Sequence, residues 1–254
     1  MIIREADDGL ILIRQTEHAR LCGLMASDWG ASGFAAPAPL EPLVVAAREH
    51  DNGWKEWEDA PRLNRETNRP HTYIDIPIDQ HLAIYRRGIA RVLVHDPYAG
   101  VMVSLHGSLL YSRFRIDQAG AADFLSEQQA MRDRLIEQLA EDPRYADHCE
   151  LETLMANRDL LFGWDALSLF LCHGEAWEKN LEFPTGRGPE RTPVRVTQRD
   201  GRWQLDPFPF RAPLAISIAT VALDGAPFES EGAMRQALRS AAPRVINVAI
   251  EPSE

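Results

Sequence analysis

The sequence predicts a mainly α protein, a helical bundle with a small antiparallel β-sheet formed by N- and C-terminal segments. Between about residues 15 and 175, apolar side chains recur at the three- and four-residue spacing of amphipathic helices. Near both ends of the chain, short apolar runs flank Asp-Gly pairs, at Asp8–Gly9 and Asp200–Gly201. Asp-Gly between such runs is typical of tight hairpin turns, because both turn residues must tolerate a positive φ.

Because both ends would contribute strands to the same sheet, we expect residues 1–254 to form a single domain. Its helical body would cover about residues 15–175. A β appendage would combine about residues 1–14 with residues 190–252. A chain of this length is long enough to bury a sizeable core in that arrangement.

Start and stop signals place the individual elements. Asp79 is expected to cap one helix, and Asp96 before a proline is expected to open the next. Residues 55–78 are polar and rich in Arg, Asn and Pro, which indicates a surface flap over a site. The expected helices cover about 16–29, 40–53, 79–92, 97–110, 121–141, 147–173 and 232–242. The expected strands cover about 2–3, 10–13, 194–197, 203–205, 214–223 and 245–250.

Composition restricts the partners and the compartment. Acidic residues outnumber basic ones by 38 to 27, which gives a net charge of −11. Such a chain disfavours nucleic acid and anionic membranes as partners, so we expect a small-molecule substrate and leave a homo-oligomer open. The most apolar segment, residues 214–223, is about half the roughly 20 residues of a membrane helix. Three cysteines without a close-spaced pair, and no signal-peptide core, favour a cytoplasmic protein.

Two adjacent His-Asp pairs compete for a role in metal binding. Asp96 precedes a proline and has a structural duty as a helix cap, so the pair His95-Asp96 is interpreted as structural. Asp51 comes late in its helix, where the helix dipole disfavours an anion. A cation bound by His50 and Asp51 would offset that cost.

Four further side chains are candidate ligands. His106 and Asp165 lie in segments that are apolar nearly all round, where an unpaired imidazole or carboxylate is costly. His18 lies on the first helix and His81 near the start of the third. For each of these, a core hydrogen bond or a salt bridge is the alternative role. The other histidines, at 71, 148 and 173, are expected at the surface.

The order of these residues resembles the HD-domain superfamily of metal-dependent phosphohydrolases and phosphodiesterases. Its members hold a metal with an early His, a His-Asp dipeptide and a late Asp, which here implies His18, His50, Asp51 and Asp165. Members with two metals add histidines from intervening helices, in the places of His81 and His106. The resemblance implies an HD-domain-like helical bundle. The stretch from Glu49 to Trp54 is most similar to an uncharacterised bacterial family of unknown function within the superfamily.

The resemblance leaves three functions open. The first is a metal-dependent hydrolase of a phosphoester or similar small substrate, with a metal-bound water as nucleophile. The second is a diiron oxygenase of the HD type that acts on a small polar substrate. The third is a non-catalytic binding or interaction domain. Mixed nitrogen and oxygen ligands imply one or two divalent transition metal ions, Fe, Mn, Zn or Ni. Many HD hydrolases have a lysine three residues after the motif aspartate, where this chain has Trp54.

Overall fold

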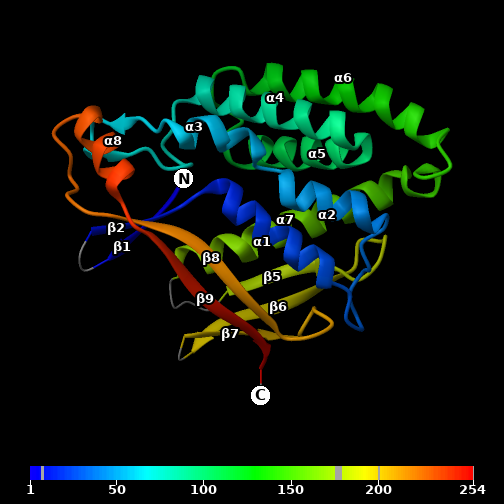
Figure 1. Ribbon diagram of the computed structural model, residues 1–254. Helices are drawn as coiled ribbons and strands as arrows, with labels where there is room; N and C mark the ends of the chain where they lie inside the picture. The colour runs from blue at the N-terminus through cyan, green and yellow to red at the C-terminus, as the bar shows by residue number, and fades with distance from the viewer. Residues whose placement is uncertain (7–8, 175–178, 200, 254) are drawn as a thin grey trace.

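A group of helices packs on one face of a large curved sheet (Figure 1). The computed structural model describes residues 1–6, 9–174, 179–199 and 201–253. The α-helices are α1 Gln15–Asp28, α2 Leu40–Glu49, α3 Lys55–Asp59, α4 Ile78–His95, α5 Pro97–Phe114, α6 Ala121–Ala140, α7 Leu151–His173 and α8 Glu231–Ser240. Two 3₁₀ turns are η1 Asn52–Trp54 and η2 Ala146–His148. The strands are β1 Ile2–Ala6, β2 Gly9–Ile13, β3 Leu63–Asn64, β4 Arg69–Pro70, β5 Lys179–Pro184, β6 Arg191–Arg199, β7 Arg202–Asp206, β8 Leu214–Leu223 and β9 Pro243–Pro252.

The helices form two layers above the sheet. Helices α1 and α7 lie next to the sheet, and α4, α5 and α6 lie on the far side from it (Figure 1). Helix α7 approaches β5 closely at Gly163. Glycine leaves room there for the ring of Phe183, which a Cβ atom would overlap. Helices α5 and α7 carry long apolar runs and are buried over most of their length. This placement explains why polar side chains on them need internal partners.

The strands of the described residues form one seven-stranded sheet in the order β1-β2-β8-β9-β7-β6-β5, and a separate pair β3-β4. Most neighbours are antiparallel, but β7 and β9 pair in parallel, with Arg202 opposite Ala249. The long strands β8 and β9 run antiparallel over their whole length, from Leu214 opposite Ile250 to Val221 opposite Pro243. Both ends of the chain therefore contribute to one mixed sheet.

The predicted fold class was wrong. The prediction was a mainly α, all-α type of bundle with a small antiparallel sheet, whereas half of the residues are helical and the sheet is large and mixed. Two physical reasons explain the error. Strand β5 has a polar sequence, Lys-Asn-Leu-Glu-Phe-Pro, that shows little apolar alternation. The parallel pairing of β7 with β9 joins segments some forty residues apart, and such pairing leaves no local pattern.

Both predicted hairpins join antiparallel strands. Ala6 pairs with Gly9 between β1 and β2, and Arg199 pairs with Arg202 between β6 and β7. Gly9 and Gly201 have the positive φ expected of turn residues. Asp8 and Asp200, the other halves of the predicted turns, lie outside the described residues.

The segment expected as an irregular flap is partly ordered. Residues 55–78 contain α3 and the short pair β3-β4, and they lead into α4. Helix α4 begins at Ile78, so Asp79 lies in its first turn and Pro77 takes the expected place of Asp79 as the residue before the helix. The turn between β4 and α4 carries Tyr73 and Ile74, which line the cavity described below.

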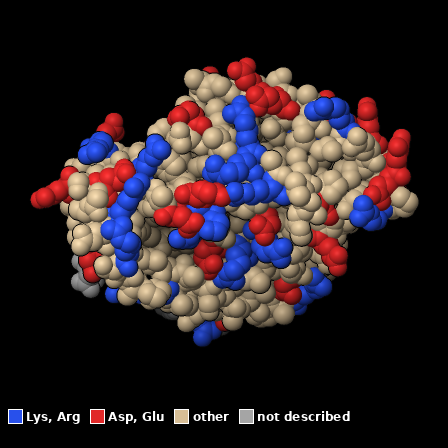
Figure 2. Space-filling view, turned by 45° about the horizontal axis from the view of Figure 1, so that its top comes forward, with Lys and Arg blue, Asp and Glu red and all other residues tan. Residues whose placement is uncertain are grey.

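The charged surface is mixed in sign. Figure 2 shows acidic and basic side chains intermingled on one face, with acidic groups directly beside the basic ones. Ion pairs account for part of this pattern, for example Glu56 with Arg87 and Arg91. In the part of the chain that the structure describes, no helix combines the length and apolar character required to span a membrane.

Candidate metal centre

Four segments bring five of the predicted side chains to one buried place. His18 comes from α1, His50 and Asp51 follow the last turn of α2, His106 comes from α5 and Asp165 from α7. Each of the five exposes 6% or less of its surface. Burial of imidazoles and carboxylates is costly unless they have partners. These five residues are called the His-Asp cluster below.

Asp165 lies at the centre of the His-Asp cluster. Its Oδ1 lies 2.9 Å from Nε2 of His18 and 3.6 Å from Nε2 of His50. Its Oδ2 lies 3.6 Å from Nε2 of His106. Oδ2 of Asp51 lies 3.8 Å from Nε2 of His18 and 3.7 Å from Nε2 of His50. All three imidazoles therefore direct the same ring nitrogen at carboxylate oxygens.

Hydrogen bonds to the opposite ring nitrogens set two of the tautomers. His50 Nδ1 donates to the carbonyl oxygen of Ala47 at 2.8 Å, and a carbonyl only accepts, so neutral His50 has its lone pair at Nε2. His18 Nδ1 bonds the hydroxyl of Ser168, which donates its own proton to the carbonyl oxygen of Asp165 at 2.9 Å. Ser168 therefore accepts from His18, which also leaves the lone pair of His18 at Nε2. Such partners orient metal-binding histidines in proteins.

Several polar atoms of the His-Asp cluster have no hydrogen-bond partner among the described residues. They are Nε2 of His18 and of His50, both ring nitrogens of His106, and Oδ1 of Asp51. The 2.9 Å approach of His18 to Asp165 is thus a charge contact without hydrogen-bond geometry. Unpartnered buried atoms are rare in proteins, and a bound cation would satisfy most of these.

Burial and charge shift the pKa values of the cluster in different directions. Burial lowers the pKa of His50, but the carboxylates of Asp51 and Asp165 outweigh it and raise that pKa to about 9. Burial raises the pKa of Asp51 and lowers the pKa of His106 to about 3. Burial also acts to raise the pKa of Asp165, but the adjacent imidazoles of His18, His50 and His106 hold it well below its usual range. The two carboxylates thus favour a proton or a metal cation on the imidazoles beside them.

The donor atoms have the spacing of a metal site. Two overlapping groups each have their ligand atoms within 4.8 Å of one another: His18, Cys22 and His50, and His50, His106 and Asp165. Imidazole and carboxylate donors suit Fe, Mn, Zn or Ni better than Mg or Ca. The donor set therefore fits the transition metal ions expected from the sequence.

His81 does not join either group of donor atoms within the described residues. Its Nδ1 bonds the hydroxyl of Tyr111, and its ring stacks on Tyr85 and meets the edge of Trp54. Burial, together with the charge of Arg115, lowers its pKa to about 3, so His81 is neutral near pH 7. It lines the same cavity as Asp51 and Asp165, beside the cluster rather than in it.

A close contact between η1 and α4 positions the His50-Asp51 pair. A Cβ atom on Gly53 would lie less than 3.0 Å from the carbonyl oxygen of Ile84 and 3.0 Å from the backbone nitrogen of Gly88. Glycine at both positions lets the two backbones touch. Arg87 adds a hydrogen bond of 2.6 Å to the carbonyl oxygen of Gly53. The residues just before Gly53 are therefore held against α4.

Three residues of the site were not found from the sequence. Gln15 donates to Oδ2 of Asp51 at 3.2 Å, and Ser168 orients His18. Cys22 Sγ lies 3.0 Å from Ser168 Oγ and belongs to one group of metal donors. Cys22 follows His18 by four residues, the spacing that puts two side chains on one helix face, so this signal was available.

A cavity of about 440 Å³ opens next to the His-Asp cluster. Asp51 and Asp165 form part of its lining, so a cation bound there would face the cavity. Its other polar lining residues are Gln15, Tyr73, His81, Tyr85, Arg115 and Gln118. Apolar side chains from α5 and α7 complete the wall, among them Phe114, Phe162 and Leu169. A concave apolar space with a few convergent polar groups is the usual form of a small-molecule site.

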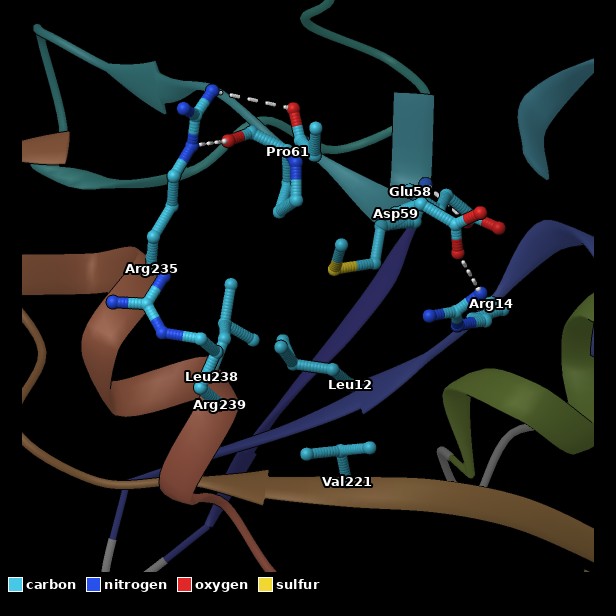
Figure 3. Close-up of a pocket in the computed structure, with 11 residues that line it drawn as sticks. Leu12, Arg14, Glu58, Asp59, Pro61, Val221, Arg235, Leu238 and Arg239 are labelled. Carbon is cyan, nitrogen blue, oxygen red and sulfur yellow. Dashed lines mark hydrogen bonds and ion pairs between the residues drawn. The ribbon is translucent and has the colours of Figure 1, made fainter. Parts of the chain in front are cut away.

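A separate cavity of about 460 Å³ lies between α3, β2, β8 and α8 (Figure 3). Figure 3 shows Arg14 paired with Asp59, and Arg235 bonded to the backbone carbonyl of Pro61. Arg235 also donates to the backbone carbonyl of Ala60. The apolar side chains of its floor include Leu12, Val221 and Leu238. No described residue lines both cavities, and the larger one contains none of the His-Asp cluster. The smaller cavity is therefore the one that adjoins the His-Asp cluster.

The competing His-Asp pair has the structural role that was predicted. The Asp96 side chain accepts a hydrogen bond of 2.8 Å from the backbone nitrogen of Ala99 and so caps α5. It also accepts a hydrogen bond of 2.9 Å from the hydroxyl of Tyr145. His95 belongs to the last turn of α4 and contributes no donor atom to either group of metal donors found among the described residues.

Comparison with known proteins identifies a family but no activity. The model of the family described as "Protein of unknown function (DUF3891)" matches residues 1–224. No curated protein and no solved structure matches the chain.

Proposed function

Because the chain belongs to the DUF3891 family, whose description states no activity, we propose its function from the site itself: a metal-dependent hydrolase acting on a phosphoester or similar small substrate. The His-Asp cluster supports this proposal, since unpartnered nitrogens of His18, His50 and His106 lie beside two carboxylates. A small-molecule substrate and a cytoplasmic location are part of the same proposal.

The residues of the cluster would divide the work between holding the ion and positioning its ligands. Nε2 of His18, His50 and His106, with carboxylate oxygens of Asp51 and Asp165, would hold one or two divalent ions. When bound, such an ion lowers the pKa of a coordinated water and polarises a phosphoryl oxygen. The carboxylate of Asp51, fixed by Gln15, would be oriented toward the cavity. The apolar walls would exclude bulk water from the reacting groups.

We propose a resemblance to the HD-domain superfamily for the site residues only, and not for the fold. The order in which His18, His50, Asp51 and Asp165 enter the cluster supports it. The large mixed sheet gives it no support at the level of the fold.

The first test is metal content with a matched control. We expect protein purified without chelator to carry a transition metal, detected by inductively coupled plasma mass spectrometry. Asp51→Asn should lower the metal content at least about tenfold, because it removes a charged ligand. Asp96→Asn is the control. It alters the other His-Asp pair and should leave metal content unchanged, with little effect on stability, because Asn caps helices about as well as Asp.

The second test is catalysis. The metal-loaded protein should hydrolyse bis-p-nitrophenyl phosphate, and Asp51→Asn should abolish this hydrolysis. Iron accompanied by oxygen consumption, without hydrolysis, would instead favour the oxygenase. A protein that neither copurifies with a metal nor binds one would refute a metal-dependent enzyme and favour a binding domain.

A further inference from the structure

The charges that line the cavity at the His-Asp cluster indicate how much negative charge its ligand carries. Asp51 and Asp165 contribute two negative charges to the lining. Among the described residues of this lining, Arg115 is the only arginine or lysine. One divalent cation would offset the two carboxylates, and Arg115 would then leave one positive charge. A ligand with a single negative charge would neutralise the cavity, whereas a polyphosphate would leave several charges without partners.

Arg115 is held in place but keeps donors free. It donates to Oε1 of Gln118 at 3.1 Å and to the carbonyl oxygens of Tyr73 and Ile74 at 3.4 and 3.1 Å. A guanidinium group has five N–H donors, so about two remain for a ligand. The same bonds fasten the turn that carries Tyr73 and Ile74 over the cavity, so Arg115 joins the wall of the cavity to its cover.

Two exposed apolar side chains lie at the mouth of the cavity, beside the exposed polar residue Gln118. Two of its lining residues are large apolar side chains that are mainly exposed, Ile74 at 62% and Phe114 at 66%. The partly buried side chains of Phe162 and Leu169 also belong to the apolar wall. A polar ligand would gain nothing from these side chains, whereas an alkyl or aryl group would remove them from water.

We propose that this site takes a small amphiphilic monoanion: a substrate whose single negative charge meets Arg115 and the metal, and whose apolar group lies between Ile74 and Phe114. The proposal rests on the proposed metal-dependent hydrolase and names its class of substrate, an ester with an alkyl or aryl group rather than a nucleotide. The anionic end would lie at Arg115 and the metal, and the apolar end at the mouth.

Binding of unreactive probes tests this proposal without relying on hydrolysis. Isothermal titration calorimetry would compare octane-1-sulfonate, methanesulfonate and ATP on protein whose metal content has been measured. Octane-1-sulfonate should bind at least about tenfold more tightly than methanesulfonate, because its chain buries apolar surface at the mouth. ATP should bind more weakly than octane-1-sulfonate. Equal affinity for the two sulfonates, or tighter binding of ATP, would overturn the proposal.

Variants assign the effect to the named residues. Phe114→Ser should weaken binding of octane-1-sulfonate about tenfold and leave methanesulfonate unchanged. Ile116→Ser is the matched control, since Ile116 is 48% exposed, lies two residues away and does not line the cavity. Arg115→Gln should weaken both sulfonates, and Arg115→Lys should restore part of the loss. An equal effect of Phe114→Ser and Ile116→Ser would refute the assignment of the apolar end.

The two proposals fail separately. Binding of octane-1-sulfonate as described, with no hydrolysis of any phosphoester, would refute the hydrolase and support the ligand class. Hydrolysis of bis-p-nitrophenyl phosphate without a preference for octane-1-sulfonate would support the hydrolase and overturn the ligand class.

Discussion

Replacing Gly53 with alanine would test how the His50-Asp51 pair is positioned. The new Cβ atom would lie less than 3.0 Å from the carbonyl oxygen of Ile84 and 3.0 Å from the backbone nitrogen of Gly88. Ordinary contacts with carbon lie near about 3.5 Å, so η1 and α4 must separate by roughly 1 Å. Overpacking costs about 1–3 kcal/mol. We expect about 3 kcal/mol here, because both contacts are backbone atoms that cannot turn away.

Urea unfolding followed by circular dichroism would measure this loss. Gly186→Ala is the control, since its Cβ would meet no atom within 4 Å, and it should change stability by less than about 0.5 kcal/mol. The loss of stability in Gly88→Ala should lie between those of Gly53→Ala and Gly186→Ala, because the closest contacts of its new Cβ atom would be 3.2 and 3.3 Å. Gly53→Ala should also lower metal content, since Asp51 moves with η1. A Gly53→Ala protein as stable as the Gly186→Ala control would refute the close contact.

Three further predictions concern His81, the surface and the metal. Tyr111→Phe removes the hydroxyl that bonds His81 and should destabilise the protein by about 1–2 kcal/mol in urea unfolding. The hydrogen bond from Arg91 lowers the pKa of Glu56 to about 2, so this pair should stabilise the fold above about pH 4.5 and lose that effect as pH falls toward 2. Glu56→Gln should flatten this part of the stability curve by less than about 1 kcal/mol, because the pair is exposed. Removal of the metal by a chelator should lower the melting temperature. If the free ion was present at 100 times its Kd, the free energy of unfolding should fall by about 2.7 kcal/mol. An unchanged melting temperature would contradict a metal bound to the folded state.

The helices were predictable because their signals are local. Apolar periodicity, the Asp96-Pro97 start of α5 and the glycine after α7 act within a few residues. The sheet was not predictable, because strand order depends on contacts between distant segments. Strand β8 lies between β2 and β9, and β9 lies beside β7, so the β2–β8 and β7–β9 pairs join strands that do not follow one another in the chain. The error in fold class came from counting local signals and underestimating a sheet built by distant pairs.

The candidate ligands that the sequence indicated best were those for which burial was already evident. His106 and Asp165 lie in apolar runs, and in the structure both are buried at the His-Asp cluster. His81 was harder to place, because it follows the start of its helix and the sequence does not show which neighbour bonds it. Tyr111, thirty residues away on another helix, decides its position. Side chains such as Ser168 act through a histidine, and no motif marks that role.

A salt-bridged cluster without a metal is the simplest alternative, and the unpartnered atoms argue against it. Asp165 could pair with a protonated His18 or His50, yet Oδ1 of Asp51 and both ring nitrogens of His106 would still lack partners among the described residues. Each such buried group costs about 1–3 kcal/mol. Asp51 also follows the last turn of α2, where the helix dipole disfavours an anion. A divalent cation would accept the histidine lone pairs and offset the second carboxylate together. The atoms that a salt bridge leaves without partners, more than the His-Asp motif itself, are therefore the reason to expect a metal here.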